Sequence, residues 1–358
     1  MPSFDIVKES EPIKTFRVAS IIGKFDLATN KVKEVFTGNI DLPNKWSVGL
    51  IVGASGTGKT TIAKELFSNS YIKNYTYNSE SIIDDMPKEC SVDDITKVFN
   101  SVGFSSPPSW LKSYSCLSNG QKMRVDLANA LLRKEKLVVF DEFTSVVDRN
   151  VAKVGSYAVQ KSIRKTQKKF IAVTCHDDVK EWLLPDWIFN TDSMTFQNFE
   201  GQKKNRPELQ FAIFETKNKS IWKLFAKHHY LNKSHNNAAK VFVAYINEKI
   251  AGFISVIHQP HARCKNLKRI HRLVVMPDYQ GIGIGIKLLE FIACKYKKEN
   301  WRISIVTSSP SLIWSLSKNK TWRLSNIGRK SKGNGVVHGR STTSSHSALR
   351  ITASFEKK

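Results

Sequence analysis

The first stretch with evident chemistry is a G-x-x-x-x-G-K-T sequence at residues 53–60, directly after an apolar run at 48–52. Glycines between a strand and a helix allow successive backbone N–H groups to close around phosphate oxygens. Lys59 can then reach the β and γ phosphates, and Thr60 can offer a hydroxyl to Mg²⁺. The sequence therefore predicts an ATP-type site. Its nucleotide-contacting residues are Gly53, Ser55, Gly56, Gly58, Lys59, Thr60 and Thr61.

A second stretch places two carboxylates at the end of an apolar strand. Residues 137–140 are apolar, and Asp141 and Glu142 follow them. A strand ending here would put Asp141 beside the Mg²⁺ that Thr60 also binds, and Glu142 where it can orient a water for attack on phosphorus. A further strand predicted at 170–174 leads to His176. Acid, hydroxyl and imidazole groups are thus expected to gather around one phosphate site.

The order and spacing of these motifs resemble those of ABC-type ATPases. Walker A lies at 53–60, Walker B at 137–141 and a D-loop at 145–148, while residues 117–121 read L-S-N-G-Q against the family's L-S-G-G-Q signature. The resemblance implies a P-loop NTPase fold in which Glu142 is catalytic and His176 is the switch histidine. It also implies a homodimer that sandwiches ATP between the loop of one copy and the signature of the other. The signature residues implied at the nucleotide are Ser118, Gly120 and Gln121.

Two departures from that family bear on function. The glutamine that normally follows the first helix is not evident, and residues 79–85 occupy its region. The segment between Walker A and the signature is also shorter than in transporter ATPases, which use it to grip membrane proteins. Both departures argue against a transporter engine.

A second glycine-rich turn occurs in the other half of the chain. Residues 280–285 read Q-G-I-G-I-G between a strand broken at Pro277 and an apolar helix expected at 286–296. Backbone N–H groups at such a helix start favour an anion such as a pyrophosphate. A Rossmann dinucleotide site is disfavoured because no acidic residue follows a second strand about 20 residues on.

The Q-x-x-G-x-G pattern resembles the acyl-coenzyme-A loop of GNAT acetyltransferases, and it is followed by a helix and a strand at 303–306. The resemblance implies an α+β domain on a mixed, mostly antiparallel sheet that binds acyl-CoA. The residues it implies at this cofactor are Val274, Val275, Gln280, Gly281, Gly283 and Gly285.

GNAT chemistry needs a base that frees an amine and an acid that protonates the departing thiolate. The candidates are His271, in the strand expected to border the acyl group, and Tyr230, which could face it from the helix at 220–228 together with His228 and His229. A serine stays open as the acid. The family's usual tyrosine after the last core strand is missing from residues 308–322.

Part of this half has a more specific resemblance. It looks like the phage Mom-type proteins that carbamoylmethylate adenine in DNA, and the residues that carry this likeness are 225–231, 271–281 and 309–310. The chain as a whole resembles a fusion of an ABC ATPase with such a domain. This resemblance implies an origin in a phage or mobile element and modification of a nucleobase.

The charge is concentrated in the same half. Residues 201–358 contain 30 Lys and Arg against 7 Asp and Glu. They therefore carry +23 of the chain's net charge of +25. A surface this basic predicts a polyanionic partner, with DNA expected first and RNA as the alternative. A basic hairpin loop is expected near 326–348, where it could contact a phosphate backbone.

Composition sets the remaining bounds. Glycine, proline and basic residues at 201–207 predict a boundary between an ATPase domain at 1–200 and a GNAT-like domain at 201–358. No apolar run has the length of a membrane span and no signal peptide is evident, so we expect a cytoplasmic protein without a membrane partner.

The five widely spaced cysteines are expected to be buried free thiols. Residues 16–22 are expected to form a strand.

The sequence thus predicts an ATP-dependent nucleic-acid-modifying enzyme with an acyltransferase domain. The group would be acetyl or carbamoylmethyl-like, and the acceptor a base amine, with adenine in DNA favoured. Two alternatives remain open. One is an ATP-dependent RNA or tRNA acetyltransferase, and the other is an ATP-switched DNA-binding protein whose GNAT domain is not catalytic.

Overall fold

The computed structural model describes residues 3–10, 15–26, 32–72, 75–202, 207–229, 234–260, 264–329, 336–337, 340–341 and 351–358. The chain forms two compact units that interleave in the sequence. Unit 1 comprises Met1–Tyr77 and Ser118–Pro207, and unit 2 comprises Asn78–Leu117 and Glu208–Lys358. The division into domains at 1–200 and 201–358 stays a prediction.

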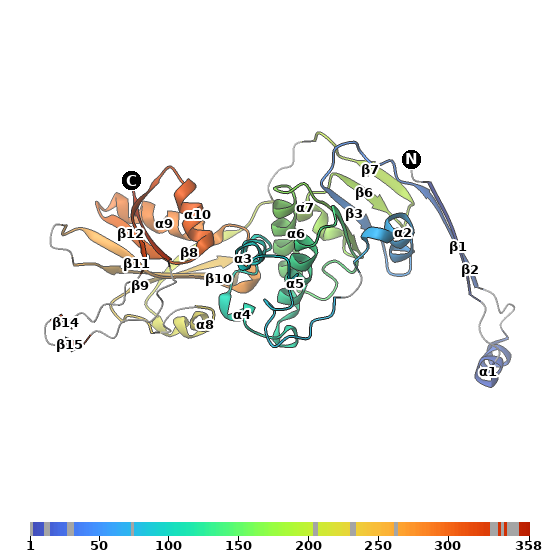
Figure 1. The fold of residues 1–358 in the computed structure, drawn as a ribbon, viewed down its shortest axis with the longest axis horizontal. Coiled ribbons are helices and arrows are strands. Elements are labelled where there is room, and N and C mark those ends of the chain that lie inside the picture. Colours follow the sequence, from blue (N-terminus) through green and yellow to red (C-terminus); the bar gives the residue numbers. More distant parts are fainter. Residues whose placement is uncertain are drawn as a thin grey trace. The chain divides into compact units, whose positions relative to one another are not determined.

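Unit 1 is built on a five-stranded sheet in the order β4-β5-β3-β6-β7 (Figure 1). The strands β3, β4, β5 and β6 are parallel, and β7 is antiparallel to β6. The central strand β3 is buried at every position, as expected for a parallel strand covered on both faces. Their bounds are β3 Val48–Val52, β4 Leu137–Phe140, β5 Lys169–Thr174, β6 Trp187–Asn190 and β7 Thr195–Asn198.

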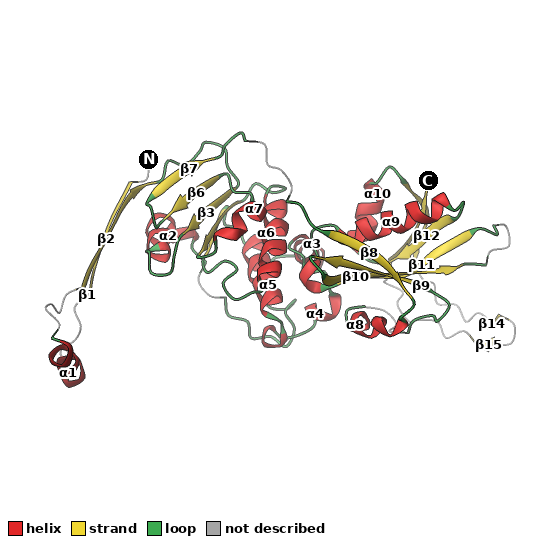
Figure 2. Ribbon diagram, turned by 180° about the vertical axis from the view of Figure 1, so that it is seen from behind, coloured by secondary structure: helices red, strands yellow, loops and turns green. Residues whose placement is uncertain are grey.

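Helices surround this sheet (Figure 2). α2 packs on β3 and β5, and α5 packs on β4 and α6. Because the loop 53–58, Asp141 and His176 each follow a parallel strand, they lie at the same edge of the sheet, which is where open α/β sheets bind ligands. The helix bounds are α2 Lys59–Phe67, η1 Ser68–Ser70, α5 Asn119–Leu132, α6 Arg149–Ile163, η3 Asp177–Val179 and α7 Lys180–Leu183.

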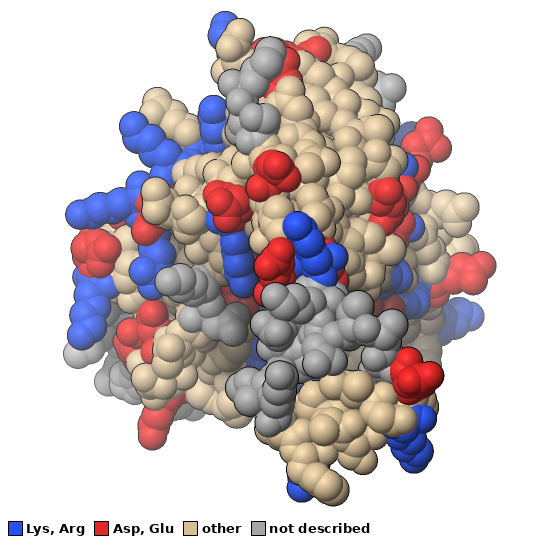
Figure 3. All heavy atoms as spheres, turned by 90° about the vertical axis from the view of Figure 1, so that its right-hand side faces the viewer, with Lys and Arg blue, Asp and Glu red and all other residues tan. Residues whose placement is uncertain are grey.

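A hairpin of β1 (Ser3–Ser10) and β2 (Val32–Asn39) also belongs to unit 1. Its Phe4 and Phe36 join the hydrophobic core with Trp187 and Phe189. Figure 3 presents the side of this hairpin, where Lys and Arg side chains are interspersed with Asp and Glu. This agrees with the near balance of 26 Lys and Arg against 24 Asp and Glu in residues 1–200.

The prediction of a strand at residues 16–22 is wrong, because this segment is part of the helix α1 (Phe16–Phe25). The Thr15 hydroxyl accepts the Val18 N–H at 3.3 Å and so caps the first turn. Asp26 adopts a left-handed conformation (φ 47°) that ends the helix. Phe25, the last residue of this helix, is 63% exposed.

Unit 2 contains a seven-stranded sheet in the order β13-β16-β12-β11-β10-β9-β8. Only the pair β11–β12 is parallel. The prediction of a mixed, mostly antiparallel sheet is therefore confirmed. The bounds are β8 Phe211–Thr216, β9 Lys240–Ile246, β10 Lys249–His258, β11 Leu267–Val275, β12 Arg302–Thr307, β13 Trp322–Arg329 and β16 Ile351–Lys357.

Helices cover both faces of this sheet, with α8 and α9 on opposite sides (Figure 1). On one face Phe253 of β10 packs with Trp222 and Phe225 of α8. On the other, Gly252 leaves room for Leu288 of α9, whose Cδ1 lies 2.6 Å from where a Cβ would be. The alternation along β10 thus sets the two sides of the sheet. The bounds are η4 Lys219–Ile221, α8 Trp222–Ala226, η5 Pro277–Tyr279, α9 Ile284–Lys298 and α10 Pro310–Lys318.

Residues 78–117, which precede the signature motif, belong to unit 2. They contain α3 (Val92–Ser101), α4 (Pro107–Trp110) and η2 (Tyr114–Cys116). The ring centroids of Phe99 and Phe104 are 5.1 Å apart, and those of Phe99 and Trp110 are 5.8 Å apart. An aromatic cluster therefore holds this segment together.

The basic loop predicted near 326–348 lies largely outside the described residues. Within it, β14 (Val336–Val337) and β15 (Arg340–Ser341) pair as a short antiparallel hairpin. None of the helices in the described part of the chain has the length and apolar character that a membrane crossing requires.

All five cysteines are free, as predicted, but the expectation that they are buried is wrong. Cys116, Cys175 and Cys294 are exposed and the other two are partly exposed. Cys116 ends η2, Cys175 follows β5, and Cys294 lies on an exposed position of α9.

Candidate functional site

The nucleotide loop has the backbone shape that its glycines predict. Gly56 and Gly58 have φ values of 88° and 84°, which side chains rarely allow. A Cβ on Gly58 would lie 2.4 Å from Cε1 of Phe36, whereas one on Gly56 would meet nothing within 4 Å. The loop is therefore packed against β2 at Gly58 and open at Gly56, where a phosphate could approach the backbone.

Two residues that sequence reasoning missed hold this loop. The Ala54 N–H donates to Oδ1 of Asp192 at 2.8 Å, and the hydroxyls of Thr57 and Thr191 are 2.6 Å apart. A Cβ on Gly53 would lie 2.2 Å from the Thr191 hydroxyl, so glycine is required there too. Because Thr191 and Asp192 follow the loop by more than 130 residues, no local pattern could have identified them.

The charged and hydroxyl side chains of the loop face different groups. Lys59 is only 9% exposed, and its Nζ donates to the Ala54 carbonyl at 2.5 Å, inside the loop that would receive phosphates. Ser55 is exposed, and the Thr61 hydroxyl accepts from Nζ of Lys8 at 2.5 Å. The Lys59 ammonium thus lies inside the loop, while Thr61 contacts Lys8 of the β1 strand.

The pair expected to bind Mg²⁺ is brought together. The Thr60 hydroxyl donates to Oδ2 of Asp141 at 2.8 Å, and Tyr71 donates to the same oxygen. A hydroxyl beside a carboxylate is the donor set that Mg²⁺ takes in proteins together with phosphate oxygens. These residues therefore fit the metal. Burial, followed by the hydrogen bond to Asp141, raises the pKa of Tyr71, so its hydroxyl keeps the proton that it donates.

Glu142 follows Asp141 in a strained turn. Glu142 and Thr144 have φ values of 50° and 69°, and the intervening Phe143 donates its N–H to the Val173 carbonyl at 2.9 Å. Because Phe143 is buried and fixed to β5, the exposed side chain of Glu142 is presented at the sheet edge. This placement suits a group that orients a water molecule.

An ion pair that the sequence did not predict connects the switch-histidine turn to the D-loop. His176 caps η3, and two residues later Asp178 pairs with Arg149 at the start of α6. Nε of Arg149 is 3.2 Å from Oδ2 of Asp178. Arg149 comes directly after Asp148, the last D-loop residue, so this contact connects two of the predicted motifs.

The signature motif forms the start of α5 through a capping box. The Ser118 hydroxyl accepts the Gln121 N–H at 3.4 Å, and Oε1 of Gln121 accepts the Ser118 N–H at 3.1 Å. Ser118 is exposed and Gly120 is buried. The S-x-x-Q spacing is a helix-start signal as well as a family motif, and the positive end of α5 suits an anion.

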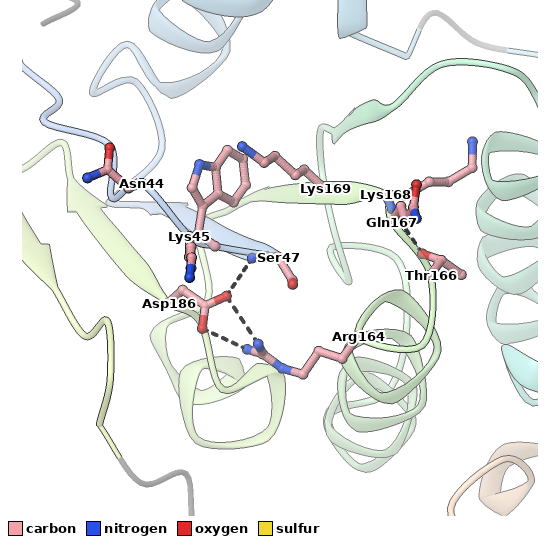
Figure 4. A pocket seen from close by; sticks show the side chains of 10 residues that line it. Asn44, Lys45, Ser47, Arg164, Thr166, Gln167, Lys168, Lys169 and Asp186 are labelled. Atoms are coloured by element: carbon pink, nitrogen blue, oxygen red, sulfur yellow. Dashed lines mark hydrogen bonds and ion pairs between the residues drawn. The ribbon is translucent and has the colours of Figure 1, made fainter.

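The opposite edge of this sheet carries a hollow of about 380 Å³ (Figure 4). There Arg164 pairs with Asp186 at 3.1 Å, and Oδ2 of Asp186 accepts the Ser47 N–H at 2.7 Å. The Lys169 ammonium lies 4.7 Å from the Trp46 ring centroid. These groups satisfy one another at the amino ends of β3 and β5, so the hollow is stabilising structure remote from the nucleotide loop.

The second glycine turn follows β11 and η5. Gly281 and Gly283 have φ values of 86° and 91°, and Gly283 caps α9 without a side-chain hydrogen bond. A Cβ on Gly283 would meet nothing within 4 Å, and one on Gly285 would lie 3.6 Å from Val275. The first N–H groups of this 15-residue helix have no partner within the helix, so they fit the pyrophosphate of acyl-CoA.

Gln280 is held by the backbone on both sides. Its Nε2 donates to the Val275 carbonyl at 3.0 Å, and its Oε1 accepts the Ser105 N–H at 2.9 Å. Ser105 belongs to the segment 78–117 of the same unit. The amide of Gln280 therefore fixes the shape of the turn.

The strands beside this turn separate. β11 pairs with β12 only from Leu267–Arg302 to Ile270–Ile305, although β11 continues to Val275. Residues 271–275 therefore have backbone groups on that side that β12 does not bind. Val274 is buried and Val275 is partly exposed at this opening. A ligand lying in the opening could form hydrogen bonds with the strand.

His271 lies at a bulge at the beginning of this opening. Ser255 pairs with Arg272 and Val256 with Ile270, which leaves His271 unpaired. Its Nε2 accepts the Asn236 N–H at 3.2 Å. Burial, followed by the charge of Arg272, lowers the pKa of His271 to about 4. The imidazole is therefore neutral at pH 7, and its Nε2 lone pair is engaged in this geometry.

His235, which the sequence did not single out, lies beside His271, and Trp222 packs against His235. The rings of His235 and His271 are 5.5 Å apart, and those of Trp222 and His235 are 5.6 Å apart. The ring centroid of His229 lies 5.7 Å from that of Trp222. The predicted acid Tyr230 lies outside the described residues, so its position relative to this cluster stays a prediction.

Comparisons with known proteins match both halves of the chain. Residues 70–145 match the family model described as ABC transporter, and residues 237–321 match the one described as Acetyltransferase (GNAT) domain. The energy-coupling factor transporter ATP-binding protein EcfA of Aster yellows witches'-broom phytoplasma (strain AYWB) is 36% identical over 66 residues, 18% of this chain and 23% of that protein. The chain thus matches under a quarter of that relative's length.

Three solved structures are among those that match parts of the chain. An IAA acetyltransferase from Bacillus cereus ATCC 14579 is 18% identical with a TM-score of 0.30, and covers 41% of this chain and 99% of its own. MJ0796, a bacterial ABC transporter cassette in dimeric form, is 15% identical with a TM-score of 0.38, and covers 47% of this chain and 93% of its own. A Bacillus subtilis acetyltransferase in complex with CoA is 17% identical with a TM-score of 0.30, covering 42% and 99%.

The predicted fusion of an ABC ATPase with a GNAT domain is therefore confirmed. The chain carries two enzyme domains, whose types use ATP with Mg²⁺ and acyl-CoA respectively.

Proposed function

We propose that this protein is an ATP-dependent nucleic-acid-modifying enzyme that transfers an acyl-type group to a base amine, with adenine in DNA as the acceptor. The observation that carries the proposal is the charge of residues 201–358, with 30 Lys and Arg against 7 Asp and Glu. A GNAT domain that acted on a small amine or a protein would have no need of such a surface. The resemblance of residues 271–281 to Mom-type adenine modifiers supports the choice of base.

In the proposed ATPase cycle, the chain binds two nucleotides in a homodimer. Backbone N–H groups of residues 53–58 and Nζ of Lys59 bind the phosphates, and Thr60 and Asp141 hold the metal. Mg²⁺ supplies neutralisation of phosphate charge when it is bound. Glu142 orients the attacking water, and His176 contacts the γ-phosphate side. Ser118, Gly120 and Gln121 of a second copy close the site.

In the proposed transfer, the start of α9 holds the pyrophosphate of the donor and the opening beside β11 holds its acyl arm. The amine nitrogen forms a bond to the carbonyl carbon while the carbon–sulfur bond breaks, and the thiolate leaves with the electron pair. One proton leaves the amine and one reaches the thiolate. His271 and Tyr230 are the candidates for moving them. His271 can act only after its bond to the Asn236 N–H opens.

In this proposal, ATP binding and hydrolysis supply the free energy that opens the duplex. An exocyclic amine in a base pair is inaccessible, and extruding the base costs a few kcal/mol. A dimer that closes on ATP and opens after hydrolysis could clamp the nucleic acid during this step. The proposed location is the cytoplasm of the host cell.

Nucleoside mass spectrometry tests this proposal. DNA and RNA from cells that express the protein are digested, with Lys59→Ala and His271→Gln as matched controls. We expect a mass-shifted deoxyadenosine with the unaltered protein and its loss in both variants. Modified RNA alone would favour an RNA acetyltransferase, and unmodified DNA and RNA together would contradict the proposal.

Salt dependence tests the nucleic-acid partner separately. If about six lysines or arginines contact phosphates, DNA affinity should fall roughly a thousandfold between 50 and 200 mM salt. An affinity that does not change over this range would contradict binding through the basic half.

A further inference from the structure

Tyr71 lies beside the metal-binding edge of unit 1, in a segment that the motifs do not cover. It follows η1 and forms an isolated parallel bridge with Val139 of β4. The next residue, Ile72, donates its N–H to the Val139 carbonyl at 3.0 Å. Val139 is buried and precedes Asp141 by two positions. The backbone of Tyr71 is therefore fixed against the end of the strand that presents this carboxylate.

The side chain of Tyr71 completes a set of three donors around Asp141. The Tyr71 and Thr60 hydroxyls both donate to Oδ2, the latter at 2.8 Å, while the Glu142 N–H donates to Oδ1 at 2.9 Å. Nζ of Lys64, one helical turn after Thr60, lies 5.1 Å from the centre of the Tyr71 ring. Both carboxylate oxygens are thus held, and the ring that holds one of them is itself packed.

We propose that Tyr71 is a positioning residue for the Mg²⁺ site. Its hydroxyl fixes the rotation of the Asp141 carboxylate and so sets how well that carboxylate binds the metal. Groups that orient metal-binding side chains in this way typically alter metal affinity 10–100-fold. The inference rests on the ATP and Mg²⁺ site and not on the acceptor of the acyl group.

The test is Tyr71→Phe, which keeps the ring and removes the hydroxyl. Binding of a fluorescent, non-hydrolysable ATP analogue is titrated with Mg²⁺ and repeated in EDTA. We expect the Mg²⁺ concentration at half-maximal nucleotide binding to rise about 10-fold or more. Nucleotide binding in EDTA should stay the same, because Tyr71 contacts the carboxylate and not the loop.

Tyr77→Phe is the matched control. The Tyr77 hydroxyl donates to Oδ1 of Asp126 on α5 at 2.7 Å, a tyrosine–carboxylate bond in the same unit that involves no predicted metal ligand. Its loss should leave the Mg²⁺ midpoint unchanged. Tyr71→His, which keeps a ring N–H donor, should give a midpoint between those of the unaltered protein and Tyr71→Phe.

Several results would overturn the inference. These are an unchanged midpoint in Tyr71→Phe, an equal shift in Tyr77→Phe, or a loss of metal-free binding in Tyr71→Phe that Tyr71→His does not restore. If Tyr71→Phe does not fold, the Mg²⁺ midpoint of Tyr71→His is the test, and a midpoint no higher than that of the unaltered protein overturns the inference. A protein that binds the analogue without any response to Mg²⁺ would instead refute the metal site itself.

Discussion

The two glycine turns of this protein use the same backbone device in different surroundings. In each, two glycines with φ between 84° and 91° are separated by one residue, and the second caps a helix without a side-chain hydrogen bond. Gly58 is pressed against Phe36, and the buried Lys59 and the Thr60–Asp141 pair follow it. A Cβ on Gly283 would meet nothing within 4 Å, Ile284 stands at the position that Lys59 has in the first turn, and the Gln280 amide before the turn binds backbone groups.

The difference indicates what each turn must bind. A triphosphate with Mg²⁺ needs a cation and metal ligands beside the N–H groups, whereas the pyrophosphate of a thioester donor can be held by the helix start alone. In the proposed function, the backbone binds an anion at both turns, and only the first turn has side chains for hydrolysis.

The largest expected effect is on ATP hydrolysis, which we assign to the first glycine turn and not to the second. Glu142→Gln should lower ATP hydrolysis about 100-fold or more while leaving acyl-CoA binding unchanged, because it removes the group that orients the water. ATP binding should persist and trap the dimer, which size-exclusion chromatography with ATP would detect. A variant that stays monomeric with ATP would contradict the assignment of the signature to a second copy's nucleotide.

The next effect concerns the packing of the glycines. Gly58→Ala should destabilise the protein by about 2–4 kcal/mol, because a left-handed alanine and a clash with Phe36 add together. Gly283→Ala should cost only about 1–2 kcal/mol, since it adds the conformational strain alone. Denaturant unfolding of the two variants measures both. Equal losses would show that the contact with Phe36 does not constrain the first turn.

A smaller effect should appear with pH. The histidines whose pKa burial lowers, His228, His235 and His271, all lie in unit 2. Between the lowered pKa of His271, about 4, and the ordinary value of 6.5, the unfolded chain binds a proton that the folded protein does not. The free energy of unfolding should therefore rise from pH 4 to 6.5, by about 1–2 kcal/mol for this partly buried group.

His271→Gln should flatten this part of the pH profile. A slope that is the same with and without His271 would contradict the burial of a neutral imidazole there. Thermal or denaturant unfolding at a series of pH values gives the comparison.

The smallest effect on stability is expected at the signature. Ser118→Ala removes a helix cap and should cost about 0.5–1 kcal/mol. Ser91→Ala removes the equivalent cap of α3, where the hydroxyl accepts the Asp94 N–H at 3.1 Å, and serves as the control. Only Ser118→Ala should also weaken ATP-driven association. Equal association in both variants would assign Ser118 a capping role alone.

Local patterns predicted the parts of this molecule that local chemistry determines. Both glycine turns, the strand before Asp141 and the capped start of α5 depend on residues within about one turn of each other, so the sequence indicates them directly. The error at residues 16–22 has a local cause too, because a short apolar run fits a strand or a helix. The cap at Thr15 was the signal that would have favoured the helix.

The contacts that complete the sites were beyond such patterns. Asp192 holds the nucleotide loop from 138 residues away, and Ser105 holds Gln280 from 175 residues away. Asn236 engages His271 across 35 residues. Each of these contacts forms only when distant strands and loops come together in the fold. No short sequence pattern therefore indicates it.

The interleaving of the two units has a consequence for how the chain can be divided. The backbone passes between them after Tyr77, after Leu117 and after Pro207. A single protease cut near residue 202 would leave residues 78–117 on the amino-terminal fragment, although that segment belongs to the unit containing Gln280. The fragments would stay associated, and a recombinant piece beginning at residue 201 would lack the Ser105 N–H that fixes its own cofactor turn. A separately expressed transferase therefore has to include residues 78–117, supplied in cis or as a second chain.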